Sequence, residues 1–170
     1  MNIVENKFKS LDEMSYILLS EMNSPRKVVL TTGVFDVPHV GHPRYLNAAK
    51  ELGNLLVVGV HSDELVRKRK GENRPIYPSY ERIEFLSYYS SVDFILELKD
   101  QNEVYRVIRQ LHPDVLVVSE TTEDIDNCPK TMGDLFGDFI KVKVLKPQSE
   151  RHSTDVIQGM KWKKSQEQKW

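Results

Sequence analysis

Cysteine is almost absent from this chain, since Cys128 is the only one among 170 residues. A single thiol excludes an intramolecular disulfide and a cysteine-rich zinc module, and it suits a reducing compartment. Long apolar runs are missing as well, because no stretch approaches the roughly 18 apolar residues that a helix needs to cross a bilayer. The N-terminal segment also lacks an apolar core behind a basic start. We therefore expect a cytoplasmic protein with no membrane association.

An excess of charge of one sign is also missing. Lys and Arg together number 24, and Asp and Glu together number 25, which gives a net charge of −1. A sequence-independent nucleic-acid binder needs a strong positive field, so we expect no nucleic-acid partner. An RNA-binding α/β domain using the basic residues 67–70 and the tail at 161–170 is a weaker alternative, because the chain offers no aromatic stacking platform.

Glycine and proline are scarce too, with eight of each, and 39% of the residues are hydrophobic, which excludes a low-complexity or disordered chain. Short apolar runs alternate with segments of helical periodicity. This alternation predicts an α/β fold with a doubly wound, Rossmann-like parallel sheet, helices on both faces and a single main domain. We expect a helical extension at 1–26, the main domain at 27–160 and a polar tail at 161–170. Strands are expected at 28–36, 55–60, 92–96, 115–118 and 139–144, a charged loop at 67–75, and a loop or insertion at 120–137.

The segment from Thr32 to His42 (TGVFDVPHVGH) carries the most informative residues. It places a glycine turn and two imidazoles, those of His39 and His42, where a strand leads into a helix. Glycine permits a close backbone approach, the helix N-terminus supplies unpaired N–H groups and a positive dipole, and each imidazole can donate to a phosphoryl oxygen. Two surface histidines or half of a metal site are the alternatives, although zinc would require a further protein ligand. The pattern predicts a phosphate site.

This segment resembles the signature of the cytidylyltransferase-like nucleotidyltransferases, a G-x-F-D turn followed by H-x-G-H. The resemblance extends from about residue 27 to residue 157, through VVGVHSDEL at 57–65 and KGENRPIYP at 70–78. It implies transfer of CMP or AMP from a nucleoside triphosphate, CTP or ATP, to a phosphorylated small molecule, with release of pyrophosphate and no covalent intermediate. It also implies Mg²⁺ or another divalent ion on the triphosphate and a possible homodimer.

The resemblance further implies roles for individual residues, which agree with the need of phosphoryl chemistry for positioned donors and cations. Asp36 could equally serve only to form the turn. Candidate catalytic residues are His39, His42 and Lys50. Candidate nucleotide-binding residues are Thr32, Gly33, Val34, Phe35, Asp36, Gly41, Ser153 and Thr154. Candidate residues for binding the substrate phosphate are Lys70, Arg82 and Arg151, and metal ligands are unknown.

The nucleotide base and the acceptor stay open. Residues 118–121 read VSET, where relatives that make ADP-heptose carry a G-G-D-like turn, and Arg151 is displaced from the arginine of glycerol-phosphate and phosphoethanolamine cytidylyltransferases. The segments at 57–63 and 70–78 resemble those of both groups of enzymes, which favours a sugar-phosphate or polyol-phosphate acceptor. Alternatives are a phosphopantetheine-type adenylyltransferase, suggested by VSET, and a noncatalytic nucleotide-binding regulatory module.

Overall fold

The computed structural model describes residues 2–20, 25–120, 128–149 and 157. In this part of the chain five strands form one parallel sheet in the order β3-β2-β1-β4-β5. The chain runs from β1 outward to β3 and then returns to β4 on the other side of β1, so the winding direction reverses between β1 and β4. This arrangement confirms the predicted doubly wound α/β class. The strands are β1 (Val28–Gly33), β2 (Leu55–His61), β3 (Phe94–Leu98), β4 (Val115–Ser119) and β5 (Lys141–Leu145).

The burial of each strand follows its place in the sheet. The central strands β1, β2 and β4 read VVLTTG, LLVVGVH and VLVVS and are almost wholly buried, as is expected where helices cover both faces. The edge strand β5 reads KVKVL and leaves Lys141, Lys143 and Val144 exposed. Charged side chains on such an edge disfavour pairing with another chain.

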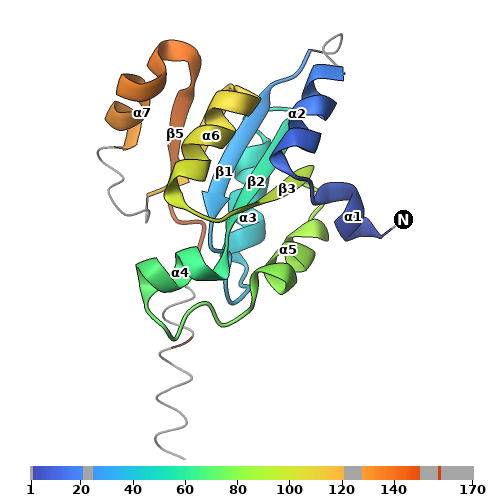
Figure 1. Ribbon diagram of the computed structural model, residues 1–170, viewed down its shortest axis with the longest axis vertical. Helices are drawn as coiled ribbons and strands as arrows, with labels where there is room; N and C mark the ends of the chain where they lie inside the picture. The colour runs from blue at the N-terminus through green and yellow to red at the C-terminus, as the bar shows by residue number, and fades with distance from the viewer. Residues whose placement is uncertain (1, 21–24, 121–127, 150–156, 158–170) are drawn as a thin grey trace, which may run out of the picture.

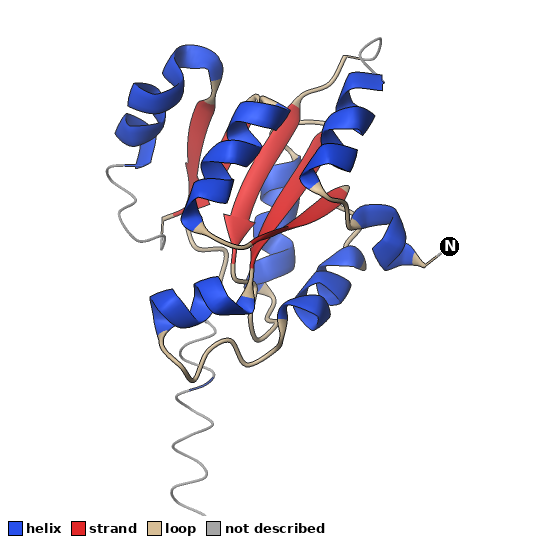
Figure 2. Ribbon diagram, viewed as in Figure 1, coloured by secondary structure: helices blue, strands red, loops and turns tan. Residues whose placement is uncertain are grey.

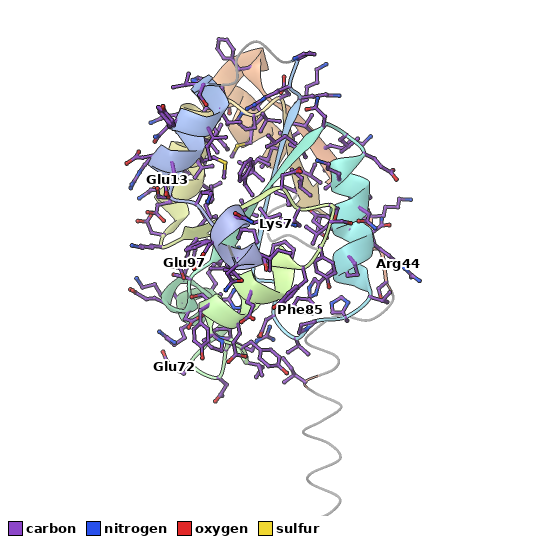
Figure 3. All side chains as sticks on the ribbon, turned by 90° about the vertical axis from the view of Figure 1, so that its right-hand side faces the viewer. Lys7, Glu13, Arg44, Glu72, Phe85 and Glu97 are labelled. Carbon is purple, nitrogen blue, oxygen red and sulfur yellow. The ribbon has the colours of Figure 1, made fainter. Side chains whose placement is uncertain are left out.

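Helices cover both faces of the sheet (Figures 1 and 2). On one face α2, α6 and α7 pack over Leu30 and Val57, and on the other α3 and α5 pack over Val29 and Leu56. Figure 3 shows the two layers edge-on, with Glu13 of α2 and Arg44 of α3 on opposite sides. The helices are α1 (Ile3–Lys7), α2 (Leu11–Ser20), α3 (Gly41–Lys50), α4 (Asp63–Lys70), α5 (Ser79–Ser87), α6 (Gln101–Leu111) and α7 (Cys128–Phe136), followed by a 3₁₀ turn at Gly137–Phe139.

The N-terminal extension is built from two capped helices. Ser10 caps α2 as its sequence predicts: its Oγ accepts from the Glu13 N–H at 3.2 Å, and the Glu13 carboxylate accepts from Ser10. The short helix α1 has the same reciprocal cap between Asn2 and Glu5, which the periodicity alone did not reveal. Met14 of α2 is fully buried in the core beside α6. The extension is thus packed on the sheet as far as the structure describes it.

Two segments expected as loops contain helix. The basic residues 67–70 continue α4, because Ser62 caps this helix through the Leu65 N–H, and Lys and Arg are good helix formers. Gly71, with φ of 90°, ends α4 in a conformation that favours glycine. Likewise, α7 occupies 128–136 of the stretch predicted as a loop or insertion. In the described residues, no helix is long and apolar enough to cross a membrane.

Candidate active site

The connection from β1 to α3 forms the turn at which the predicted site residues gather. Phe35 and Val37 both have positive φ, 53° and 48°. The ring of Phe35 folds back over Gly33, where a Cβ atom would lie only 2.9 Å from the Phe35 ring, so glycine is required for this close approach. Positive φ at the β-branched Val37 is strained, and such strain persists where the surroundings hold it in place. Phe35 is 7% exposed and shapes the turn by packing.

The imidazoles of His39 and His42 lie side by side, with ring centroids 4.1 Å apart. The Gly41 N–H donates to His39 Nδ1 at 3.1 Å, which assigns the proton of neutral His39 to Nε2. A Cβ on Gly41 would lie 2.7 Å from His39 Cε1, so this glycine lets the first ring rest against the start of α3. The Phe35 ring contacts His42 edge-on at 5.6 Å. These contacts hold both rings at the carboxyl end of β1.

The start of α3 differs from the prediction in one respect. The Gly41 N–H is taken by His39 Nδ1, the His42 N–H donates to the His39 carbonyl at 3.0 Å, and Pro43 has no N–H. The expectation of unpaired backbone donors at this helix N-terminus is therefore wrong for these positions. An anion at this helix start would therefore interact with the helix dipole and the two imidazoles.

Burial makes His42 an uncharged group. Burial foremost, and the charge of His39 after it, lower the pKa of His42 to about 4 against the opposing effect of Asp36. Its Nδ1 is buried with no hydrogen-bond partner in the part of the chain described. A buried polar atom without a partner costs stability, so its presence calls for an explanation, of which a catalytic role is one. At neutral pH, His42 therefore has a single N–H to donate.

Asp36 fastens a distant loop to this turn. Its carboxylate is 1% exposed and accepts from Arg74 Nε at 2.9 Å, from the Ile76 N–H at 2.8 Å and from the Tyr77 N–H at 3.0 Å. Both oxygens are thus engaged by the loop at 71–78. Of the two roles considered for Asp36, the geometry favours the organisation of the turn over nucleotide contact.

Arg82 serves a similar purpose from α5. The side chain is 2% exposed, and its guanidinium donates to the Val34 carbonyl at 2.5 Å, the Tyr77 carbonyl at 2.9 Å and the His61 carbonyl at 2.8 Å. It also forms an ion pair with Asp63 at 2.8 Å. These protein acceptors occupy the donors that were predicted to hold a substrate phosphate. Arg82 instead ties together the histidine turn, the loop at 71–78 and the end of β2.

Lys50 lies away from the histidines. It is the last residue of α3, and its ammonium pairs with Asp93 and donates to the Asn54 carbonyl at 2.6 Å. Asp93 also accepts from the Leu56 N–H at 2.6 Å, at the amino end of β2. Eight residues of helix separate His42 from Lys50 by roughly 12 Å along the axis. The structure thus places the charge of Lys50 beside Asp93 at the opposite end of the sheet from the histidines, and its predicted role in neutralising phosphate charge stays a prediction.

The remaining candidates lie around the same edge or outside the described residues. Thr32 and Gly33 are half-buried at the end of β1, and Lys70 is exposed at the end of α4. Arg151, Ser153 and Thr154 lie outside the described residues. The chain just before them passes the start of α3, since the Gln148 carbonyl accepts from Arg44 at 3.4 Å. No group of three potential metal ligands occurs among the residues that the structure describes.

His61 was not singled out from the sequence, although it ends the segment VVGVH. It is the last residue of β2 and is 6% exposed. Burial lowers its pKa to about 4, helped by Arg69, Arg82 and Lys70, and its Nδ1 has no hydrogen-bond partner among the described residues. Its position in a strand is typical of a core residue. The basic surroundings come from α4 and α5, whose packing the sequence does not show.

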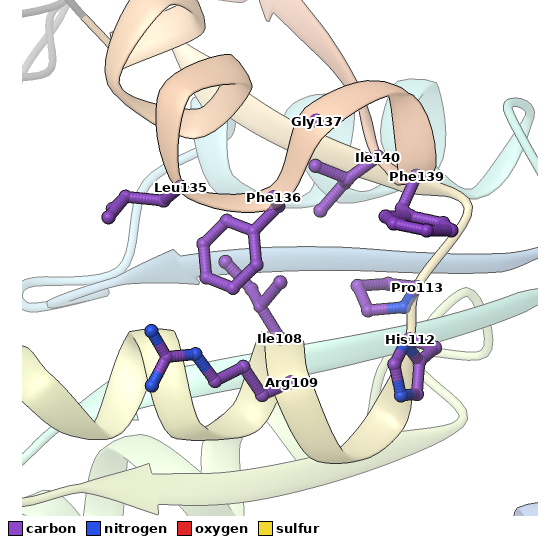
Figure 4. Close-up of a pocket in the computed structure, with 9 residues that line it drawn as sticks. All are labelled: Ile108, Arg109, His112, Pro113, Leu135, Phe136, Gly137, Phe139 and Ile140. Atoms are coloured by element: carbon purple, nitrogen blue, oxygen red, sulfur yellow. The ribbon is translucent and has the colours of Figure 1, made fainter.

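Two grooves open on the surface. A groove of about 250 Å³ beside the histidine turn is lined by Pro38, Tyr77, Glu81, Arg82 and Phe85. A second, apolar groove of about 310 Å³ lies between α6 and the segment from α7 to β5 (Figure 4). Its residues His112 and Ile140 precede the amino ends of β4 and β5, so this groove is at the opposite edge of the sheet from the histidines. Of these two grooves, only the first lies beside the histidine turn.

The structure defines an α/β protein with an imidazole pair at the switch point of its sheet, an arrangement suited to a phosphorylated ligand. Comparison with known proteins agrees, because the profile described as Cytidylyltransferase-like matches residues 30–159. The chain is 41% identical over 113 residues to a Bifunctional protein HldE of Citrifermentans bemidjiense, covering 66% of this chain and 23% of that protein. A protein of the same name from Campylobacter jejuni is 39% identical over 120 residues, covering 71% of this chain and 25% of the relative.

Solved structures show the same fold. A lipopolysaccharide core biosynthesis protein from Thermoplasma volcanium matches with a TM-score of 0.61 and 27% identity, covering 75% of this chain and 100% of the other. A pantoate-beta-alanine ligase from Francisella tularensis, solved with an ATP compound and beta-alanine, matches with a TM-score of 0.62 and 13% identity over 87% of this chain and 69% of that one. The second similarity concerns the fold alone.

The chain belongs to the cytidylyltransferase-like family. It spans about a quarter of the length of the curated relatives that it matches. The family resemblance stated from the histidine turn is thereby confirmed.

Proposed function

We propose that this protein transfers AMP or CMP from ATP or CTP to the phosphate of a sugar or polyol phosphate and releases pyrophosphate. The observation that supports this proposal is the pair of imidazoles, 4.1 Å apart, on the turn between β1 and α3. Two adjacent nitrogen donors at the positive end of a helix suit a phosphoryl group whose charge is spread over several oxygens.

The reaction needs no protein nucleophile. An oxygen of the acceptor phosphate forms a bond to the α-phosphorus, while the bond from this phosphorus to the oxygen bridging to the β-phosphate breaks. The electron pair of that bond leaves with pyrophosphate. Nε2–H of His39 and the single N–H of neutral His42 donate to the α-phosphate oxygens, and each such donor contributes about 100-fold or more in rate. Both rings are held in place by the turn, so little reorganisation is needed.

A divalent ion, Mg²⁺ by preference, would neutralise the triphosphate oxygens and the departing pyrophosphate. Asp36 is the only carboxylate of the turn at 34–40, and both of its oxygens already accept hydrogen bonds from the loop at 71–78. The triphosphate and water would therefore supply most of the ligands, and the ion would enter with the nucleotide.

The similarity to a lipopolysaccharide core biosynthesis protein supports a sugar-phosphate acceptor over a polyol phosphate or phosphopantetheine. The loop KGENRPIYP resembles that of enzymes acting on sugar phosphates and polyol phosphates alike, and Asp36 holds it against the histidine turn. A polar acceptor would meet the groove beside Pro38, which offers the Glu81 carboxylate and the Tyr77 ring.

The deciding experiment is pyrophosphate release by the purified protein with Mg²⁺, with ATP and CTP each crossed with heptose and other sugar 1-phosphates, glycerol 3-phosphate, phosphocholine, phosphoethanolamine and phosphopantetheine. We expect release that depends on one sugar or polyol phosphate and falls about 100-fold or more in His42→Ala. Nucleotide binding without release for any acceptor would favour the regulatory module, and release with phosphopantetheine alone would contradict the proposed acceptor class.

A homodimer is also proposed for this enzyme. Large apolar side chains are exposed around the histidine turn and α5, including Val40 at 51%, Tyr80 at 67% and Tyr88 at 63%. Exposed apolar side chains of this size are of the kind that a second copy of the chain would cover. Sedimentation of the purified protein should give the mass of two chains, and Tyr88→Glu should shift it to one; a single-chain mass for the unmodified protein would contradict the dimer.

A further inference from the structure

His61 is a buried polar residue that the reaction described above does not use. It ends β2, the strand next to β1, so it lies at the same carboxyl edge as the histidine turn. The side chain is 6% exposed, and Nδ1 has no hydrogen-bond partner in the part of the chain that the structure describes. An apolar residue would fill this position in a strand without an unsatisfied nitrogen, so the imidazole calls for a functional explanation.

The charged surroundings of His61 are mainly basic. Three cationic side chains, Arg69, Arg82 and Lys70, lie near enough to disfavour a positive charge on the imidazole. Asp63 is the carboxylate that pairs with Arg82, whose guanidinium also donates to the His61 carbonyl. The imidazole is therefore an uncharged hydrogen-bonding group inside a positive field.

His61 approaches the carboxyl edge from the opposite face of the sheet to His42. Side chains alternate along β2, and Val57 packs in the core under α2 and α6, whereas Leu56 and Val60 pack under α3. By this alternation His61 shares the face of Val57. The histidine turn leads into α3 on the other face, so the two imidazole groups flank the ends of β1 and β2.

We propose that His61 contacts the phosphate group of the acceptor and positions it for attack. This inference rests on the proposed function. In phosphoryl transfer the incoming and leaving oxygens lie on opposite sides of the phosphorus, so the acceptor phosphate and the pyrophosphate must occupy separate places. The triphosphate is assigned to the start of α3. The acceptor phosphate then lies on the side of β2 and α4, where His61 and its basic neighbours are.

A direct test uses methyl phosphate as the probe. The full chain is labelled with ¹³C-histidine, and the ring signal of His61 is assigned by its loss in His61→Gln. Methyl phosphate titrated at constant ionic strength should shift the His61 signal in a saturable way and leave that of His112 unchanged, because His112 is exposed at the opposite edge of the sheet. A His61 signal that does not move would overturn the proposal, and this readout does not depend on any transferase activity.

Kinetics then distinguish the acceptor from the nucleotide. For the pair of substrates that supports turnover, His61→Gln should raise the KM for the acceptor about tenfold and leave the KM for the nucleotide within about twofold, with His61→Asn as a second variant if the first does not fold. A raised KM for the nucleotide alone, or unchanged constants, would overturn the assignment. If the unmodified protein transfers no nucleotidyl group while methyl phosphate still shifts His61, the proposed function fails and the phosphate contact stands.

Discussion

Asp36 and Arg74 form a buried ion pair, with Oδ2 and Nε 2.9 Å apart and side chains that are 1% and 11% exposed. The pair joins the histidine turn to a loop that follows it by 38 positions, and the Ile76 N–H strengthens it by donating to the same oxygen. The geometry of the histidines thus depends on a contact outside the motif that contains them.

Asp36→Asn should lower the free energy of unfolding by about 3 kcal/mol, because it leaves the buried Arg74 charge uncompensated and places an amide where the loop offers only donors. Urea denaturation measures this change. Glu64→Gln is the matched control, since the side chains of Lys68 and Glu64 are 67% and 69% exposed and their pair is expected to contribute little to stability. Equal effects of the two variants would show that the Asp36 pair does not hold the turn.

His39→Ala and His42→Ala should each lower kcat by about 100-fold or more with little change in stability, because each removes one donor to the α-phosphate. Pyrophosphate release gives kcat, and circular dichroism confirms the fold. His112→Asn is the control, because His112 has φ of 45° at the end of α6 and asparagine tolerates that conformation. Full turnover by either alanine variant would refute the assigned role.

Lys50→Met should act on stability and not on turnover. The substitution leaves Asp93 without its charged partner at the amino end of β2, and the half-exposed position limits the loss to about 1 kcal/mol. We expect kcat to stay within about threefold of the unmodified enzyme, since roughly 12 Å of helix separates residue 50 from His42. A 100-fold loss of kcat with unchanged stability would instead restore the catalytic role predicted from the sequence.

Stability should fall as the pH drops from about 6.5 to about 4. Burial lowers the pKa of both His42 and His61 to about 4, from an ordinary value of 6.5. Within this window the unfolded chain binds protons that the folded chain does not, so the free energy of unfolding rises with pH, by up to roughly 3 kcal/mol for each histidine. Urea denaturation at pH 7.5 and pH 5 measures the slope. His61→Gln should flatten it, and an unchanged slope would mean that His61 is protonated normally in the folded state.

Local patterns in the sequence were sufficient to predict most of the strands and helices and the histidine turn. Continuous apolar runs predict β1, β2 and β4, because strands that are buried on both faces need no alternation of polar and apolar residues. The spacing of Ser10 and Glu13 predicts the start of α2, because this cap depends on residues three positions apart. The apolar patterns of two short helices are weak: the sequence does not predict α1, and it predicts a loop or insertion where α7 lies. Their helical state depends on caps and on packing more than on periodicity.

The chain by itself determined the order of strands and helices, the glycine turn and the adjacency of His39 and His42, since these follow from spacing along a few residues. Only the tertiary structure decided which partner each charged side chain meets. The sequence predicts ligand contacts for three charged residues that instead meet protein partners far along the chain. Asp36 pairs with Arg74, 38 positions away, and Lys50 pairs with Asp93, 43 positions away. Arg82 donates to the Val34 carbonyl, 48 positions away. A charge next to a motif has a strong electrostatic interaction with whatever the fold brings to within a few ångströms, and that neighbour is set by how the helices pack on the sheet.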